Sequence, residues 1–382
     1  MESTIYLDYA ATSPMYPEVI EVMSEAMQTT FGNASSIHQF GRKSRGYLDE
    51  ARAVFARSIH ANSNEIIITS GGSESDNTAI LKTAEKYKSI GKHIITTNIE
   101  HEAVLKPMKY LESKGFDVTY LPADKDGFVS AEQVKAALRN DTILVSIMSG
   151  NNEVGSIMPI AEIGSILKNS NPAVVFHTDA VQSYGSQDID VDEMNIDLLS
   201  VSAHKIGGPK GIGFLYCREN IKLPSLILGG EQETKRRAGT ENIPAIIGFQ
   251  KAVELMMKDK KQRNVYYRKL KEKLINNLKQ AGVDLEINGS YDSSLPHIVS
   301  IYLKGIDAER LLIHLDLVGI AVSTGSACTA GNVDPSHVLS AMFGVEHSAI
   351  SETVRISLGL GTTEKDIDKV VIELSKIIKR LK

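Results

Sequence analysis

Short apolar runs, separated by loops and amphipathic stretches, repeat along the first half of the chain. Several runs are rich in Ile and Val and show no alternation of apolar and polar residues, as expected for strands covered on both faces. Stretches with helical spacing lie between many of them, which predicts strand–helix–strand units and a mostly parallel sheet. The expected strands are Glu65–Thr69, His93–Thr97, Asp117–Leu121, Thr142–Ile147, Ala173–Thr178, Leu198–Val201 and Ile212–Tyr216, and the expected helices include Ser75–Tyr87, Glu102–Ser113 and Ala161–Lys168.

The second half of the chain has a different pattern. Residues 243–280 are helical and increasingly charged, and we interpret the basic segment 258–273 as a solvated helix face rather than a nucleic-acid patch. The elements expected beyond it are the strands His297–Leu303 and Thr353–Leu358 and the helices Ala308–Leu315 and Glu364–Leu381. This mixture is typical of a smaller α+β domain. We therefore predict an α/β protein with a large domain at 15–255 and a small domain formed by 1–14 and 256–382.

Composition and charge narrow the class of protein. Of the 382 residues, 42% are hydrophobic and 23% are charged, which is ordinary for a soluble globular protein. The net charge of -5 gives no electrostatic footprint for nucleic acid or a membrane surface. Two cysteines form no disulfide framework, and neither a signal peptide nor an apolar run of about 18 residues is present. These features predict a cytoplasmic protein with no direct nucleic-acid or membrane partner.

Two charged residues stand where buried strands end. Lys205 follows the strand that ends near Val201, and a lysine beside a buried strand can form a Schiff base with an aldehyde cofactor. Asp179 follows the strand that ends at Thr178, in the crevice where α/β sheets bind ligands, and pyridoxal phosphate needs a carboxylate at its ring nitrogen. The alternatives are an exposed loop lysine and a helix N-cap aspartate.

Two further loops follow predicted strands. Residues Gly71, Gly72 and Ser73 lie between a strand and a helix, where backbone amides and the helix dipole favour a phosphate. The sequence there is neither GxxxxGK[ST] nor GxGxxG, and a tight turn capped by Ser73 is the alternative. His101 follows the strand that ends at Thr97 and could stack on a flat cofactor or relay protons, or it is an ordinary loop histidine.

The two cysteines and one arginine differ in their surroundings. Cys328 lies among small residues in Ser323-Thr-Gly-Ser-Ala-Cys328-Thr-Ala-Gly, which predicts an accessible thiol, whereas Cys217 ends an apolar strand and is expected to be structural. Arg355 lies on an apolar strand and needs a partner. A substrate carboxylate is one candidate, and an internal salt bridge is the other.

These motifs occur in an order that resembles the NifS/IscS-type cysteine desulfurases among the class V aminotransferase-like enzymes. The resemblance covers nearly the whole chain, and the Gly-Ser-Ala-Cys and Ser-x-His-Lys elements are its most specific parts. In order, the motifs are 7–12 (LDYAAT), 69–77 (TSGGSESDN), 100–101 (EH), 151–155 (NNEVG), 177–183 (HTDAVQS), 202–213 (SAHKIGGPKGIG), 237–242 (RAGTEN), 325–328 (GSAC) and 355–359 (RISLG).

The resemblance implies a pyridoxal-phosphate enzyme of fold type I, with a mostly parallel seven-stranded sheet in its large domain and the catalytic cysteine loop in its small domain. It implies that Lys205 holds the cofactor and that His101 stacks on the ring. Asp179 would pair with the ring nitrogen and Gln182 with the ring hydroxyl. The phosphate would be held by Gly72, Ser73, Ser202 and His204 of one subunit and by Thr240 of the other, in a homodimer.

The same resemblance implies the reaction. Asn152 and Arg355 would bind the carboxylate of L-cysteine, and Lys205 would remove its α-proton. Cys328 would take the sulfur, which gives L-alanine and an enzyme persulfide. No metal site is expected from the chain itself, although Cys328 could contribute one ligand to an iron–sulfur cluster shared with a partner.

The sulfur acceptor and the exact activity stay open in the sequence. The acceptor could be an iron–sulfur scaffold, a tRNA-thiolating enzyme or a thiamine-pathway sulfurtransferase. Relatives that serve the scaffold carry a longer tail than this chain, which ends at Lys382, so the scaffold is the less certain of the three. The alternatives to a desulfurase are a selenocysteine lyase of the same fold, against which the Gly325–Cys328 loop argues, and a non-catalytic scaffold, against which Lys205 and Cys328 argue.

Overall fold

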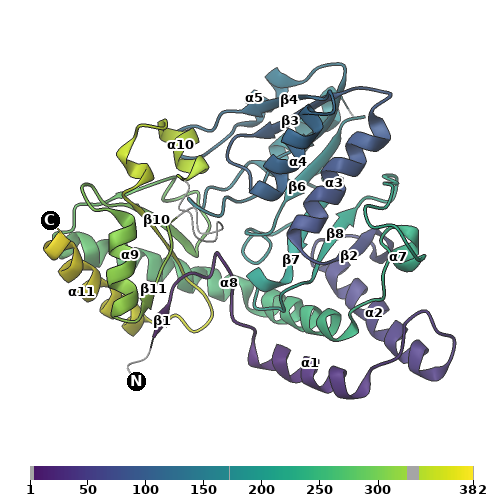
Figure 1. Cartoon of the computed structure of the whole chain (residues 1–382), viewed down its shortest axis with the longest axis horizontal. Coiled ribbons are helices and arrows are strands. Elements are labelled where there is room, and N and C mark those ends of the chain that lie inside the picture. The colour runs from purple at the N-terminus through teal and green to yellow at the C-terminus, as the bar shows by residue number, and fades with distance from the viewer. Residues whose placement is uncertain (1–3, 172, 325–334, 382) are drawn as a thin grey trace.

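The computed structural model describes residues 4–171, 173–324 and 335–381. Within them the chain forms a seven-stranded sheet covered by helices on both faces, and a second, smaller group of strands and helices (Figure 1). This confirms the predicted fold class, an α/β protein with a smaller α+β part. None of the helices in these ranges combines the length and apolar character that crossing a membrane requires.

The large sheet has the strand order β2-β8-β7-β6-β5-β3-β4. Strand β8 runs in the opposite direction to the other six strands, so the sheet is mostly parallel, as predicted. Every residue of β2, β3, β5, β6, β7 and β8 is buried, which explains their continuous apolar sequences. The strands are β2 Ile66–Thr69, β3 His93–Thr97, β4 Asp117–Leu121, β5 Thr142–Ser146, β6 Val175–Asp179, β7 Leu198–Ser202 and β8 Gly213–Cys217.

Helices cover both faces of this sheet. On one face α3 and α4 pack against alternate residues such as Ile67, Ile94 and Leu215. On the other face α2, α5, α6 and the first part of α8 pack against residues such as Ile68 and Phe214. The helices of this part of the chain are α1 Pro17–Thr29, α2 Gln39–Arg57, α3 Gly72–Tyr87, α4 Glu102–Glu112, α5 Ala131–Ala137, α6 Ile160–Ser170, α7 Gln232–Lys235 and α8 Ile243–Gln280.

The smaller part contains a three-stranded antiparallel sheet, β12-β10-β9, and a two-stranded parallel pair, β1-β11. The N-terminal strand β1 therefore lies beside a strand more than 300 residues later, and Figure 1 shows both chain ends on this side. The elements are β1 Ile5–Tyr6, β9 Glu286–Ile287, β10 Ile298–Tyr302, α9 Ala308–Leu317, β11 Ile320–Ala321, α10 His337–Phe343, β12 Thr353–Ser357 and α11 Glu364–Leu381.

Helix α8 connects the two parts. Its 38 residues contact α1 and α2 at one end and α11 at the other. Residues up to Met256 belong to the hydrophobic cluster of the large sheet, and residues from Tyr267 onward belong to that of the small sheet. The predicted boundary at 255/256 lies inside this continuous helix. Helix α10 packs at Val338 in the cluster of the large sheet, so residues 256–382 are not one packing unit.

Candidate active site

A cavity of about 250 Å³, partly open to solvent, lies at the carboxyl ends of the parallel strands of the large sheet. We call it the central cavity. Ligands of open α/β sheets bind at this edge because loops from several strands converge there. Its lining is Ala10, Ala11, Gly72, Ser73, Asp76, His101, Met148, Gly150, Asn152, Asp179, Val181, Gln182, Ser202, His204, Lys205 and Arg355. The structure thus brings together every described residue of the predicted site except Thr240.

Lys205 ends a short 3-10 helix that follows β7 directly. Its ammonium donates hydrogen bonds to the carbonyl oxygens of Ala10 (2.6 Å) and Ala11 (2.9 Å), which come from the N-terminal segment. The side chain is half-buried rather than exposed in a loop. An amine at the cavity wall can react with a carbonyl ligand from there.

Asp179 and His101 line the same cavity as this amine. Asp179 is the last residue of β6, and its Oδ1 accepts from the amide of Val181 (2.8 Å). Burial raises the pKa of the Asp179 carboxyl, while the charges of His101 and Lys205 oppose the rise. No helix starts at Asp179, so the helix N-cap alternative is wrong.

His101 is the N-cap of α4. Its Nδ1 accepts from the amide of Ala103 (3.0 Å), so a neutral ring carries its proton on Nε2. Burial lowers the pKa of the His101 imidazole, Lys205 lowers it further, and Asp179 opposes both. A neutral, oriented imidazole can stack on a ring or hand on a proton.

The turn between β2 and α3 forms the end of the central cavity that is suited to bind a phosphate. Helix α3 begins at Gly72 with Gly71 as N-cap, and no side chain caps it, so the alternative of a turn capped by Ser73 is wrong. Gly71 has φ 145°, a conformation that favours glycine. Uncapped amides at a helix N-terminus bind anions. The hydroxyl of Ser202 and the imidazole of His204 line the same cavity.

Arg355 lies on β12 and is 3% exposed. Its guanidinium donates to the Asn152 carbonyl oxygen (3.0 Å) and to Asp8 Oδ1 (2.9 Å), so the internal salt bridge expected as the alternative is present. Its buried Nε has no hydrogen-bond partner among the described residues. A planar donor group with a bond still to make, in a cavity wall, can bind a carboxylate.

The N-terminal segment 8–13 is the part of the site that the sequence analysis missed. Besides Lys205 it holds Gln182, whose Nε2 donates to the Ala10 carbonyl oxygen (2.8 Å), and His204, whose Nδ1 lies 3.1 Å from Thr12 Oγ1. The LDYAAT motif at 7–12 belongs to the resemblance, but no role is predicted for its residues. Asp76, Met148 and Gly150 also line the cavity without having been predicted.

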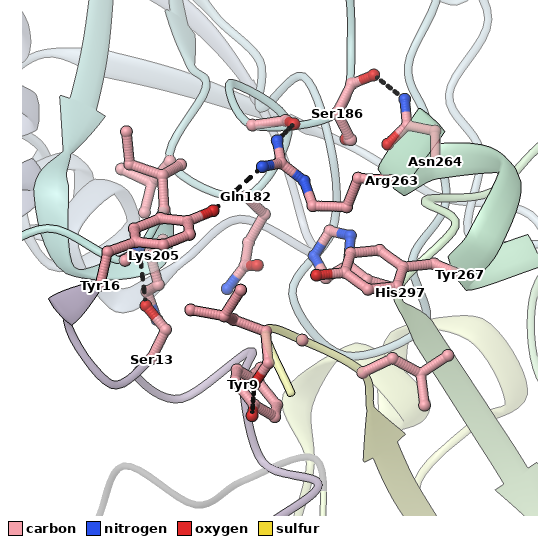
Figure 2. A pocket seen from close by; sticks show the side chains of 17 residues that line it. Tyr9, Ser13, Tyr16, Gln182, Ser186, Lys205, Arg263, Asn264, Tyr267 and His297 are labelled. Atoms are coloured by element: carbon pink, nitrogen blue, oxygen red, sulfur yellow. Dashed lines mark hydrogen bonds between the residues drawn. The ribbon is translucent and has the colours of Figure 1, made fainter. Parts of the chain in front are cut away.

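A second, smaller cavity, of about 60 Å³, lies beside the central one. Figure 2 shows Lys205 and Gln182 at its wall, with Arg263, Tyr267 and His297 on its other side. Arg263 donates to Tyr16 Oη (3.1 Å) and to the Gly185 carbonyl oxygen (2.9 Å). Because Val181, Gln182 and Lys205 line both cavities, these three residues form the partition between them.

Thr240 and Cys217 lie apart from the central cavity. Thr240 is exposed and lines neither cavity. Cys328 lies outside the described residues. Cys217 is buried as expected, its Sγ lies 3.0 Å from the Ile221 carbonyl oxygen, and burial raises the pKa of its thiol to about 11. No three His, Cys, Asp or Glu side chains of the described ranges form a metal-binding group.

The geometry of this site agrees with comparisons to known proteins. A model of the family described as "Aminotransferase class-V" matches residues 5–370. The chain belongs to this family. A cysteine desulfurase named IscS from Dictyoglomus turgidum is 46% identical over 382 residues, which cover 100% of this chain and 96% of that protein. The relative named IscS 1 from Bacillus subtilis (strain 168) is 53% identical and is matched over 99% of both chains.

Solved structures agree with the sequence relatives. A structure described as a NifS-like protein has a TM-score of 0.92 and 35% identity, and the match covers 99% of this chain and 100% of that one. A structure of SspA in complex with cysteine has a TM-score of 0.81 and 38% identity over 93% of this chain and 99% of that one. The predicted activity, a pyridoxal-phosphate-dependent cysteine desulfurase, is confirmed by these full-length relatives.

The residues of the central cavity fit pyridoxal phosphate, the cofactor that the family implies. An amine, a buried carboxylate and an uncapped helix N-terminus match its aldehyde, its ring nitrogen and its phosphate. Glycines let the chain segments around this turn pack closely. A Cβ added to Gly72 would lie 2.7 Å from Val181 Cγ2, and one added to Gly213 would lie 2.8 Å from Gly71 Cα.

Proposed function

We propose that the chain removes sulfur from L-cysteine and transfers it to its own Cys328. The observation that carries this proposal is the placement of Lys205, Asp179, His101 and Arg355 in the walls of one cavity. The family activity supplies the substrate, and Cys328 supplies the thiol that such a transfer requires. The overall change is L-cysteine and an enzyme thiol to L-alanine and an enzyme persulfide, with no external oxidant or reductant.

Binding would use both ends of the cavity. Gly72, Ser73, Ser202 and His204 would hold the cofactor phosphate, and Asp179 would keep the ring nitrogen protonated, with Gln182 at the ring hydroxyl. When bound, pyridoxal phosphate supplies an electron sink for the pair of electrons left at the substrate α-carbon. Arg355 and Asn152 would fix the substrate carboxylate beside it.

The proton transfers would belong to Lys205 and His101. Lys205 would hold the cofactor through its amine and would take the substrate α-proton as a base. His101, held by its N-cap bond, would stack on the ring and pass protons at Nε2. Cys328 would attack the substrate sulfur as a thiolate, because the thiolate is the nucleophilic form. The Cβ–S bond breaks, and Cβ gains a proton in forming alanine.

The functional unit would be a homodimer in the cytoplasm. Thr240 would reach the phosphate in the partner subunit, which accounts for its exposure outside its own cavity. The persulfide would pass to an acceptor protein: an iron–sulfur scaffold, a tRNA-thiolating enzyme or a thiamine-pathway sulfurtransferase. During this transfer Cys328 would also bind metal, as one ligand of an iron–sulfur cluster shared with the acceptor.

Anaerobic turnover of L-cysteine by wild type, Cys328→Ala and Cys217→Ala tests the proposal. Alanine, sulfide and protein-bound persulfide are assayed together, with the visible absorption of the bound cofactor. We expect wild type and Cys217→Ala to form alanine and persulfide. Cys328→Ala should keep the cofactor band and form no persulfide.

The two cysteine variants are a matched pair, since each removes one thiol and only one removes the proposed acceptor. Release of alanine and sulfur by Cys328→Ala at the wild-type rate would contradict the role of Cys328 and leave a lyase reaction. If Cys217→Ala folded but formed no persulfide, Cys217 rather than Cys328 would be the sulfur acceptor, and the proposal would be wrong.

A further inference from the structure

A buried ion pair lies at the edge of the large sheet, away from the central cavity. Arg52 of α2 and Glu233 of α7 make two parallel hydrogen bonds, of 2.7 and 2.8 Å. Their side chains are 11% and 2% exposed, so the pair is shielded from water. Two-bond geometry between an arginine and a carboxylate fixes orientation as well as distance.

This pair completes the hydrogen bonding of the edge strand β2. Glu233 Oε2 accepts from the Ile68 amide (2.9 Å), and Arg52 donates to the Ile66 carbonyl oxygen (2.6 Å). These are the groups of β2 that face away from β8. The ion pair therefore takes the place of a further strand. It also ties α7 to the strand that leads into the Gly71–Gly72 turn.

The backbone at Glu233 adopts a conformation that side chains rarely take. Glu233, Thr234 and Lys235 have φ of 48°, 57° and 67°, so three consecutive non-glycine residues are left-handed. Such residues persist only where surrounding contacts determine them. Here those contacts include the Glu233 ion pair and the bond from Ser225 Oγ to the Lys235 carbonyl oxygen (2.7 Å).

A second ion pair holds the other side of the same segment. Arg237 donates to Glu74 Oε1 (3.0 Å), and Glu74 Oε2 accepts from the Ser70 amide (2.8 Å). Burial works against ionisation, but the hydrogen bonds from Arg237 and Ser70 prevail and lower the pKa of Glu74. Thr240 follows Arg237 by three residues. The two pairs thus fasten the chain at Glu233 and at Arg237, in the segment that leads to Thr240.

We propose that Glu233 is a positioning residue for the cofactor of the partner subunit. Its bonds to Arg52 and Ile68 fix the left-handed turn on the rigid sheet edge, and that turn presents Thr240 to the phosphate in the other subunit. This role rests on the proposed homodimer and deepens it. The residue acts through Thr240 and touches neither substrate nor cofactor.

Mixed dimers separate this role from a purely structural one. One subunit carries Lys205→Ala, so the visible band of lysine-bound pyridoxal phosphate reports only the intact subunit. Glu233→Gln is placed in the Lys205→Ala subunit, whose Thr240 serves the intact site. Asp49→Asn is the matched control, because it neutralises the acid of the exposed Arg45–Asp49 pair on the same helix as Arg52.

We expect Glu233→Gln in this arrangement to raise the dissociation constant of pyridoxal phosphate at the intact site by about 5- to 150-fold, the range of coupling between distinct sites. The ³¹P resonance of the bound phosphate should shift, while Asp49→Asn changes neither. If Glu233→Gln prevents folding, Arg237→Gln replaces it, since that arginine is 25% exposed and less of the fold depends on it.

Three results would overturn the proposal. Unchanged affinity and an unchanged ³¹P resonance, with only a lower melting temperature, would make the pair a structural cover of the sheet edge. Weaker binding only when Glu233→Gln is in the intact subunit would place its effect within one subunit. A wild-type monomer in sedimentation would reject the homodimer together with this role, whereas the first two results leave the desulfurase activity untouched.

Discussion

At the residue scale, Glu100 supports the cavity from behind its wall. The side chain is fully buried, both carboxyl oxygens accept from the Met148 amide (2.9 and 3.1 Å), and Thr97 Oγ1 donates to Oε1 (2.8 Å). It precedes His101 and joins the ends of β3 and β5. Burial raises the pKa of Glu100 from 4.5 to about 8 against these hydrogen bonds. The Glu100 carboxyl is therefore protonated in the folded protein over part of the neutral pH range.

This pKa gives the free energy of unfolding a pH dependence. The folded state binds the Glu100 proton more tightly than the unfolded chain, so its contribution is fully present below pH 4.5 and is lost as pH rises to about 8. We expect Glu100→Gln to gain at least about 1 kcal/mol relative to wild type between pH 5 and pH 8. Urea unfolding of both proteins across this range measures the difference. A difference independent of pH would mean that Glu100 is ionised throughout.

A substitution can separate the internal hydrogen bonds of Arg355 from its proposed role in binding the substrate carboxylate. Arg355→Lys keeps a positive charge but loses the planar group that bonds Asp8 and Asn152. We expect KM for L-cysteine to rise about 10- to 100-fold, the cost of a charged hydrogen bond, with the cofactor band unchanged. Arg139→Lys, at an exposed ion pair, is the control. An unchanged KM would limit Arg355 to the internal salt bridge.

At the element scale, two helical glycines have opposite surroundings. Gly164 of α6 lies against the chain after β6, where an added Cβ would lie 1.9 Å from the Met194 carbonyl oxygen. Gly46 of α2 has nothing within 4 Å of that position. The first glycine permits a close helix approach, and the second only leaves the helix backbone freer in the unfolded chain.

Alanine at these two positions should therefore shift stability in opposite directions. Gly164→Ala is expected to lower the free energy of unfolding by about 1–3 kcal/mol, because backbone cannot move aside as a side chain can. Gly46→Ala should raise it by about 0.5–1 kcal/mol through helix propensity. Chemical denaturation of both variants measures the pair. Equal effects would show that α6 shifts freely away from Met194.

At the scale of the whole molecule, several large apolar side chains in α1 and in the loop after it are exposed. Met27 near the end of α1, and Phe31 and Ile37 in the loop between α1 and α2, are 62%, 74% and 91% exposed. Leu228, before the turn of Glu233, is 83% exposed. Exposed apolar groups of this size often mark an interface. The proposed homodimer would cover them and bring the Thr240 turn to the partner.

Charge in this region should then weaken the dimer. We expect Ile37→Asp to raise the dimer dissociation constant by about tenfold or more, as for a central apolar contact. Val345→Asp is the control, since Val345 is 75% exposed in the loop after α10, a helix that lies away from α1 and α2 in Figure 1. Sedimentation at several concentrations measures both. Equal dissociation constants for the two variants would place the interface elsewhere.

The sequence by itself determined the strands of the large sheet and the chemistry at their ends. Strands such as β3 and β6 are buried on both faces, so their apolar runs carry the signal locally. Residues such as Lys205 and Asp179 follow those strands directly, and parallel strands end at one edge, so their convergence could be predicted. Helices α1 and α2 were missed, because no buried strand flanks them closely.

Only the tertiary structure decided which distant segments complete the site. Asp8 and Ala10 reach Arg355 and Lys205 across 347 and 195 residues, and Glu233 meets Arg52 across 181. These contacts depend on how the chain returns to the sheet, through the β1–β11 pairing and the long helix α8. Local patterns specify a segment's own period and burial. They carry no information about which segment, hundreds of residues away, will supply its hydrogen bonds.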